Sequence, residues 1–227
     1  MRRTAYQTLV VAIVATALAG TSLAFAAAVP ARAASGAPAK VVIVVGPTGS
    51  ATASYIDDAT AAADAARRWT TDVEEIYTPA ATWDRVAAAL QGASIVVYMG
   101  HGNGFPDPRS RTYDGATQDG LGLDPPGGGN AASSAKYYGA DLIAAQVRLA
   151  PSAVVILAHL CYAAGSSEPG MPDPTPAVAR QRADGFAAGW MRAGARAVTL
   201  VGDLVEVRRR ETSADLCAFD LTPGFEG

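Results

Sequence analysis

The stretch SIVVYMGHGNG, residues 94–104, places a histidine directly after an apolar, β-branched run. A short continuous apolar run bounded by turn residues is typical of a strand buried on both faces of a parallel sheet. A second stretch, AVVILAHLC at residues 153–161, repeats the pattern and brings a second histidine and a cysteine to the end of its run. The two stretches therefore predict two buried strands, each followed by chemically reactive side chains.

Outward from these two stretches, apolar runs alternate with segments that carry apolar residues at helical spacing. This alternation predicts a three-layer α/β sandwich with a mainly parallel sheet and right-handed crossovers. We expect the strand order 2-1-3-4-5, in which strands three and four are neighbours. The expected strands are residues 41–45, 73–77, 94–99, 153–158 and 195–201. The expected helices are residues 53–69, 82–90, 138–149 and 177–193.

The first residues have the features of an export signal. Arg2 and Arg3 precede an apolar stretch, and Ala31-Arg32-Ala33 supplies a small-x-small cleavage pattern. The alternative is an uncleaved membrane anchor, because the weakly apolar stretch continues to Val29. The expected divisions are a signal peptide over 1–33, a linker over 34–39, one α/β domain over 40–203 and a polar tail or incomplete domain end over 204–227.

Composition limits the classes of function. The chain has 227 residues, enough for one domain, and half of them are hydrophobic, which suffices for a core. The formal net charge is −3, and removal of residues 1–33 takes away three arginines to leave about −6. Nothing in this balance indicates a nucleic-acid partner. We expect a secreted or cell-surface protein, with no stable membrane insertion after signal cleavage.

The two histidines of the chain each follow one of the buried runs. If strands three and four are neighbours, His101 and Cys161 project from adjacent carboxyl ends into one region, where ligands bind in sheets of this kind. An imidazole beside a thiol favours the thiolate nucleophile, and the glycine at position 102 leaves a backbone N–H free to bind an oxyanion. The competing interpretation of Cys161 is a disulfide with Cys217. We expect a reactive thiol, with Cys217 too far away to bridge.

An apolar strand ending in His-Gly, followed later by an apolar strand leading into Cys, resembles the caspase-like superfamily of caspases, gingipains, legumains, separase and bacterial CHAT proteases. The stretch FAAGWMRAGARAVTLVGD (residues 186–203) is similar to the helix, AGA turn and strand of CHAT-type domains. The resemblance implies that His101 is the catalytic histidine, Gly102 the oxyanion-hole glycine and Cys161 the nucleophile. Two features depart from the family: the bulky Leu160 before the cysteine, and a polar C-terminus that lacks a further helix and strand, so that the domain is either truncated there or followed by unrelated sequence.

These features predict a secreted bacterial cysteine endopeptidase that cleaves a peptide or protein substrate and needs no cofactor or metal. The first alternative is a non-catalytic caspase-like module that binds a partner at the cell surface. The second is a metal-dependent hydrolase that uses His101 and His159. We expect His159, Asn103 and Asp203 to support the reactive pair.

The long glycine-rich stretch at 102–135, for which no regular structure is expected, contains acidic residues at several positions. Asp114, Asp119 and Asp124 lack the spacing of an EF-hand calcium loop. We therefore expect them to lie in a solvated loop.

Overall fold

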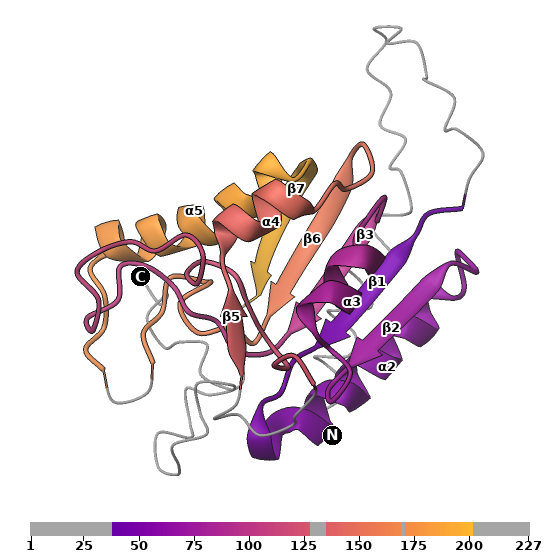
Figure 1. Cartoon of the computed structure of the whole chain (residues 1–227), viewed down its shortest axis with the longest axis horizontal. Helices are drawn as coiled ribbons and strands as arrows, with labels where there is room; N and C mark the ends of the chain where they lie inside the picture. Colours follow the sequence, from indigo (N-terminus) through magenta and orange to yellow (C-terminus); the bar gives the residue numbers. More distant parts are fainter. Residues whose placement is uncertain (1–37, 128–134, 169–170, 202–227) are drawn as a thin grey trace, which may run out of the picture.

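The computed structural model describes residues 38–127, 135–168 and 171–201. The expected signal peptide, most of the linker, the tail and Asp203 lie outside these residues. Within them the chain forms an α/β fold in which five strands make one sheet (Figure 1). The strands and helices, in chain order, are β1 (Val41–Val45), η1 (Gly49–Ala51), α2 (Thr52–Ala66), β2 (Val73–Tyr77), α3 (Trp83–Ala89), β3 (Ile95–Met99), β4 (Leu121–Leu123), β5 (Lys136–Tyr138), α4 (Ala140–Gln146), β6 (Ala153–Ala158), α5 (Pro176–Arg192) and β7 (Ala195–Val201).

The order of the main sheet is β2-β1-β3-β6-β7, and every neighbouring pair is parallel. This confirms the predicted order 2-1-3-4-5 and the adjacency of its third and fourth strands, which are β3 and β6. The central strands β1 and β3 are buried along their whole length. Their continuous apolar runs follow from this burial, because a helical layer covers each face of the sheet.

Alternate residues of the strands enter two separate cores. Val42, Tyr98 and Leu157 belong to the larger core, together with buried residues of α3, α4 and α5. Ile43 and Val97 belong to the smaller core, which α2 closes through alanines and Tyr55. The sheet is therefore the middle of three layers, as the sequence predicts.

The ends of α5 illustrate how local sequence fixes an element. The Thr175 hydroxyl accepts a hydrogen bond from the Val178 amide at 3.3 Å, and Pro176 occupies the first turn. After the helix ends, Gly194 has a φ of +108°, which a residue with a side chain adopts only with strain. These signals explain why the expected helix, residues 177–193, agrees closely with the observed one.

Two expectations about secondary structure were wrong. The stretch 102–135 is not wholly irregular, since β4 forms within it and pairs antiparallel with β5. The helix expected over 138–149 is shorter, because the backbone turns to an extended conformation at Val147. The helix also starts later than expected, because β5 takes up residue 138.

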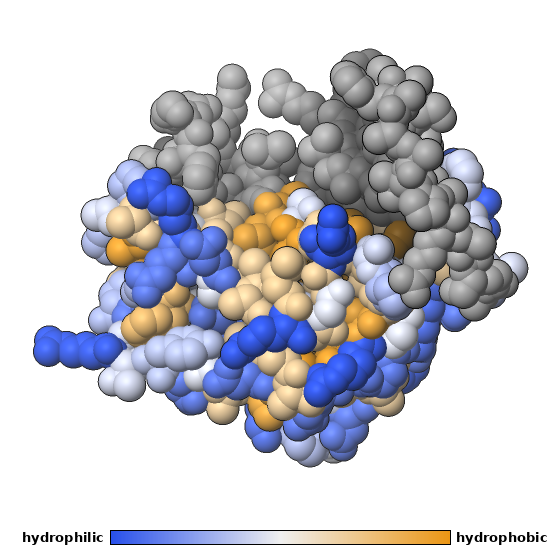
Figure 2. Space-filling model, turned by 90° about the horizontal axis from the view of Figure 1, so that it is seen from above, coloured by the Kyte–Doolittle hydropathy of each residue, from blue (hydrophilic) through white to orange (hydrophobic). Residues whose placement is uncertain are grey.

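The surface is mixed in character. Hydrophilic residues are spread among apolar ones over the face shown in Figure 2. The large hydrophobic side chains that are exposed in the described part of the chain are Trp69, Tyr113 and Met191. No helix among the described residues is both long and apolar enough to cross a membrane.

Candidate functional site

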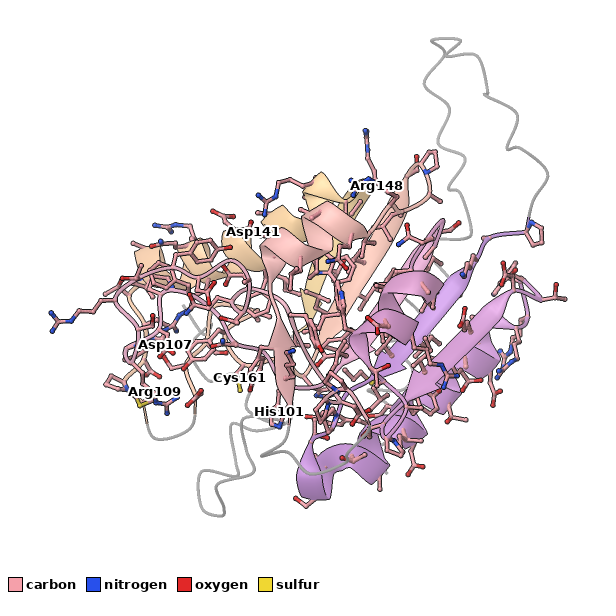
Figure 3. All side chains as sticks on the ribbon, viewed as in Figure 1. His101, Asp107, Arg109, Asp141, Arg148 and Cys161 are labelled. Atoms are coloured by element: carbon pink, nitrogen blue, oxygen red, sulfur yellow. The ribbon has the colours of Figure 1, made fainter. Side chains whose placement is uncertain are left out.

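The candidate site lies where β3 and β6 end. Met99 pairs with Ala158 in the parallel register, so both strands reach the same edge of the sheet. His101 follows β3 by two residues and Cys161 follows β6 by three, and both are found at this end of the fold (Figure 3). Parallel pairing thus brings together the two loops that contain the predicted reactive residues.

Gly102 packs directly on the backbone of Cys161. A Cβ atom at position 102 would lie 2.4 Å from the Cys161 carbonyl oxygen and 3.1 Å from the Leu160 Cβ. Real Cβ atoms do not approach a carbonyl oxygen so closely, so only glycine fits at this position. The structure therefore places Gly102 beside Cys161.

The backbone of His101 is held by the Tyr98 hydroxyl and β4. The Tyr98 hydroxyl donates to the Gly122 carbonyl at 2.7 Å, accepts from the Gly122 amide at 3.0 Å, and lies 3.1 Å from the His101 carbonyl oxygen. The Gly122 amide also donates to the His101 carbonyl at 3.0 Å. Tyr98 is fully buried, so this arrangement connects the His101 backbone to the buried centre of the sheet.

Cys161 is buried, with 1% of its surface exposed, and it is disulfide-bonded. The other cysteine of the sequence, Cys217, lies outside the described residues. The expectation of a free thiol was therefore wrong for this form of the protein. A disulfide sulfur has no thiolate to offer, so this form cannot attack a carbonyl group.

His159 lies on the other side of the sheet from the Cys161 side chain. Its ring stacks on Tyr55 of α2, with centroids 4.4 Å apart and an interplanar angle of 21°. Cys161 instead belongs to the larger core, on the face covered by α3, α4 and α5. Burial lowers the pKa of His159 to about 4, because the charged ring would be removed from water.

Asn103 is the other predicted supporting residue that lies within the described part of the chain. The Asn103 side-chain amide donates to the Thr117 backbone carbonyl at 3.1 Å, and the Asn103 backbone carbonyl accepts from the Asp119 backbone amide at 2.7 Å. This residue therefore shapes the loop after β3. In the ranges 38–127, 135–168 and 171–201, no group of three or more His, Cys, Asp or Glu side chains is arranged to hold a metal ion.

Of the three aspartates that were expected to be solvated, two are buried. Asp124 is fully buried and accepts hydrogen bonds from the Thr78 hydroxyl at 2.7 Å and the Ala81 amide at 2.8 Å. Asp119 accepts from the Phe105 amide at 2.9 Å. Asp119 therefore ties two parts of the segment after β3 together, and Asp124 joins the end of β4 to the residues that follow β2. Asp114 is exposed, as expected, and accepts from the Thr117 hydroxyl at 2.8 Å.

Tyr98 and Arg182 both contact the loops of the site, and neither was predicted from the sequence. Tyr98 lies within the apolar run of β3, where a tyrosine is usually a core residue. The strand β4 could have been predicted from the short alternation Leu121-Gly122-Leu123, in which two apolar residues flank a glycine. No comparable pattern in the sequence indicates the partners of Arg182.

Asp119→Asn should stabilise the protein near neutral pH. Burial raises the pKa of Asp119 to about 6 from 3.8 in an unfolded chain, so the folded state favours the protonated form. Its contribution to stability is fully present below pH 3.8 and is lost as the pH rises to about 6 and beyond. Asparagine keeps an acceptor for the Phe105 amide without the buried charge. We expect a gain of about 1–2 kcal/mol at pH 7, allowing for partial solvent screening, and no gain at pH 3.5.

Urea unfolding of the wild type and the variant at both pH values measures this difference. Asp114→Asn is the matched control, because Asp114 is in the same loop and exposed. A gain at pH 7 that is equally large at pH 3.5 would show that titration of Asp119 is not its cause.

Comparisons with family models, curated proteins and solved structures found no match to this chain. The assignment of the site therefore rests on the geometry of the chain itself. That geometry consists of two loops from adjacent parallel strands, a glycine packed on the cysteine backbone and a histidine whose backbone is fixed beside them.

Proposed function

We propose that this protein is an exported, caspase-like cysteine endopeptidase, with His101 as acid and base and Cys161 as nucleophile in the reduced form. The observation that carries the proposal is the pairing of β3 with β6, together with the close packing of Gly102 on Cys161. This arrangement brings a histidine loop and a cysteine loop to one edge of a parallel sheet, where such sheets bind ligands.

The proposed chemistry needs only groups of the chain and water. The Cys161 thiolate attacks the carbonyl carbon of a peptide bond, and the Gly102 amide donates to the oxygen that becomes negative. The His101 imidazolium gives a proton to the leaving amine, and an acyl thioester remains on Cys161. His101 then takes a proton from water, the resulting hydroxide attacks the thioester, and the thiolate is released with the carboxylic acid product.

The proposed setting rests on the export signal that the sequence predicts. The protein would act on peptides or proteins outside a bacterial cell or at its surface. An oxidising environment favours the disulfide form of Cys161, so the peptidase requires a thiol or dithiol reductant to release the sulfur.

The Cys217→Ser variant tests the proposal, because Cys161 is then the only cysteine of the chain. It cannot form an intramolecular disulfide, so no added reductant is needed. We expect iodoacetamide to alkylate this protein at pH 7 about ten times faster than it alkylates a free cysteine, since a neighbouring imidazolium raises the thiolate fraction. Adding His101→Ala should return the rate to that of free cysteine. Mass spectrometry of the alkylated peptide gives the rates.

Cys217→Ser with His159→Asn is the matched control and should remain fast, because His159 packs on the opposite face of the sheet. Alkylation no faster than that of free cysteine, or a rate that His101→Ala leaves unchanged, would refute the peptidase.

The second candidate is a non-catalytic module that binds a peptide or a cell-surface partner. The disulfide at Cys161 favours it, and so does Leu160, which is buried against Gly102 and contributes bulk where a substrate oxyanion would bind. Slow alkylation of the Cys217→Ser protein, with the fold retained, would favour this candidate.

A further inference from the structure

The two loops of the candidate site run beside each other beyond the sheet. We call residues 100–109 the histidine loop and residues 159–168 the cysteine loop. Gly102 packs on Cys161, and a Cβ at Gly104 would lie 2.3 Å from the Cβ of Tyr162. Further along, Arg109 forms a salt bridge with Glu168 at 2.5 Å. The loops thus continue the parallel course of β3 and β6.

Arg182 of α5 contacts both loops with one guanidinium group. Its Nε donates to the carbonyl of Pro106 in the histidine loop at 2.8 Å. Its Nη1 donates to acceptors in the cysteine loop, namely the Gly165 carbonyl at 3.4 Å, the Ser166 carbonyl and the Ser167 hydroxyl at 3.1 Å. The guanidinium carbon also lies 4.5 Å from the centre of the Tyr162 ring, within the range of a cation–π contact.

This arginine is buried, with 2% of its surface exposed. Arg182 donates hydrogen bonds to carbonyl oxygens and a hydroxyl, while the carboxylates of Asp107 and Glu168 act on it through their charge. Burial of a cation is unfavourable unless many donors are satisfied, and the planar fork of arginine reaches acceptors on both sides at once. A lysine has one compact charge in place of this fork and cannot duplicate the arrangement.

We propose that Arg182 is a positioning residue that sets the spacing between the histidine loop and the cysteine loop, and hence between His101 and Cys161. The proposal deepens the proposed peptidase and depends on it for its catalytic part. Its structural part, the joining of the two loops, is measured separately.

The test uses the Cys217→Ser protein, in which Cys161 is the only cysteine. Arg182→Met removes the donors and retains an unbranched side chain. Arg180→Met is the matched control, because Arg180 lies on the same helix and is exposed. Hydrogen exchange of the Phe105 and Gly165 amides reports on the histidine loop and the cysteine loop, respectively.

We expect Arg182→Met to accelerate exchange in both loops at least tenfold and Arg180→Met to leave both unchanged. The pH dependence of Cys161 alkylation should move toward that of free cysteine in Arg182→Met, with a roughly tenfold lower rate at pH 7. Arg182→Lys should give intermediate exchange and alkylation, and it replaces Arg182→Met as the test if the methionine variant does not fold.

Exchange that changes in neither loop, or in only one, would overturn the proposal. Faster exchange in both loops with an unchanged alkylation profile would overturn the positioning role and leave Arg182 as a purely structural contact. If the parent protein itself reacts no faster than free cysteine, the peptidase fails, while the exchange result still decides whether Arg182 joins the loops.

Discussion

Phe186→Ala should lower the free energy of unfolding by about 3–5 kcal/mol, the range typical of deleting a fully buried aromatic ring. Phe186 is completely buried on α5. Its ring edge faces the histidine loop, since a Cβ at Gly104 would lie 2.8 Å from Phe186 Cε2 and one at Gly102 would lie 3.2 Å from Phe186 Cζ. The substitution therefore opens a cavity directly beneath the candidate site.

Urea unfolding at pH 7 measures the effect, with Met191→Ala as the matched control. Met191 is on the same helix and 50% exposed, so its truncation should cost less than about 0.5 kcal/mol. Phe186→Leu fills most of the cavity and should cost about 1–2 kcal/mol. A Phe186→Ala protein no less stable than Met191→Ala would contradict the packing described for α5.

The central architecture could be predicted because it depends on local patterns. Continuous β-branched runs mark β1 and β3 as strands covered on both faces, and parallel pairing follows from the helices between them. The adjacency of the loops that contain His101 and Cys161 then follows from strand order and parallel direction. The position of these two loops at one edge of the sheet was therefore predictable, while the pairing of the two side chains stays a prediction.

Features that depend on contacts between distant segments could not be predicted in this way. Asp124 is buried because it accepts hydrogen bonds from residues 46 and 43 positions away, and no spacing rule describes that pairing. The oxidised state of Cys161 was left open by a cysteine count that suits both a disulfide and a reactive thiol. Arg182 resembles an ordinary helical arginine until the fold brings both loops to it.

His159 should make the protein sensitive to acid. Its pKa is about 4 in the folded protein and 6.5 in an unfolded chain, so the folded state favours the neutral ring. Its contribution to stability is fully present above pH 6.5 and is lost as the pH falls to about 4. At about 1.4 kcal/mol for each pKa unit, the loss is about 3 kcal/mol. Protonation of Asp119 acts in the opposite direction over an overlapping range, so Asp119→Asn should make the acid sensitivity steeper.

His159→Asn is the informative variant, because His159 has a φ of +63° and asparagine tolerates this left-handed conformation. The variant loses the stacking on Tyr55 and should be less stable than the wild type at pH 7.5. Between pH 6.5 and 4.5, however, it should lose about 2 kcal/mol less stability than the wild type does. His101→Asn removes the other histidine of the chain and should keep the steep acid response. Urea unfolding across this pH range measures all three proteins, and an acid response that persists in His159→Asn would show that another group is responsible.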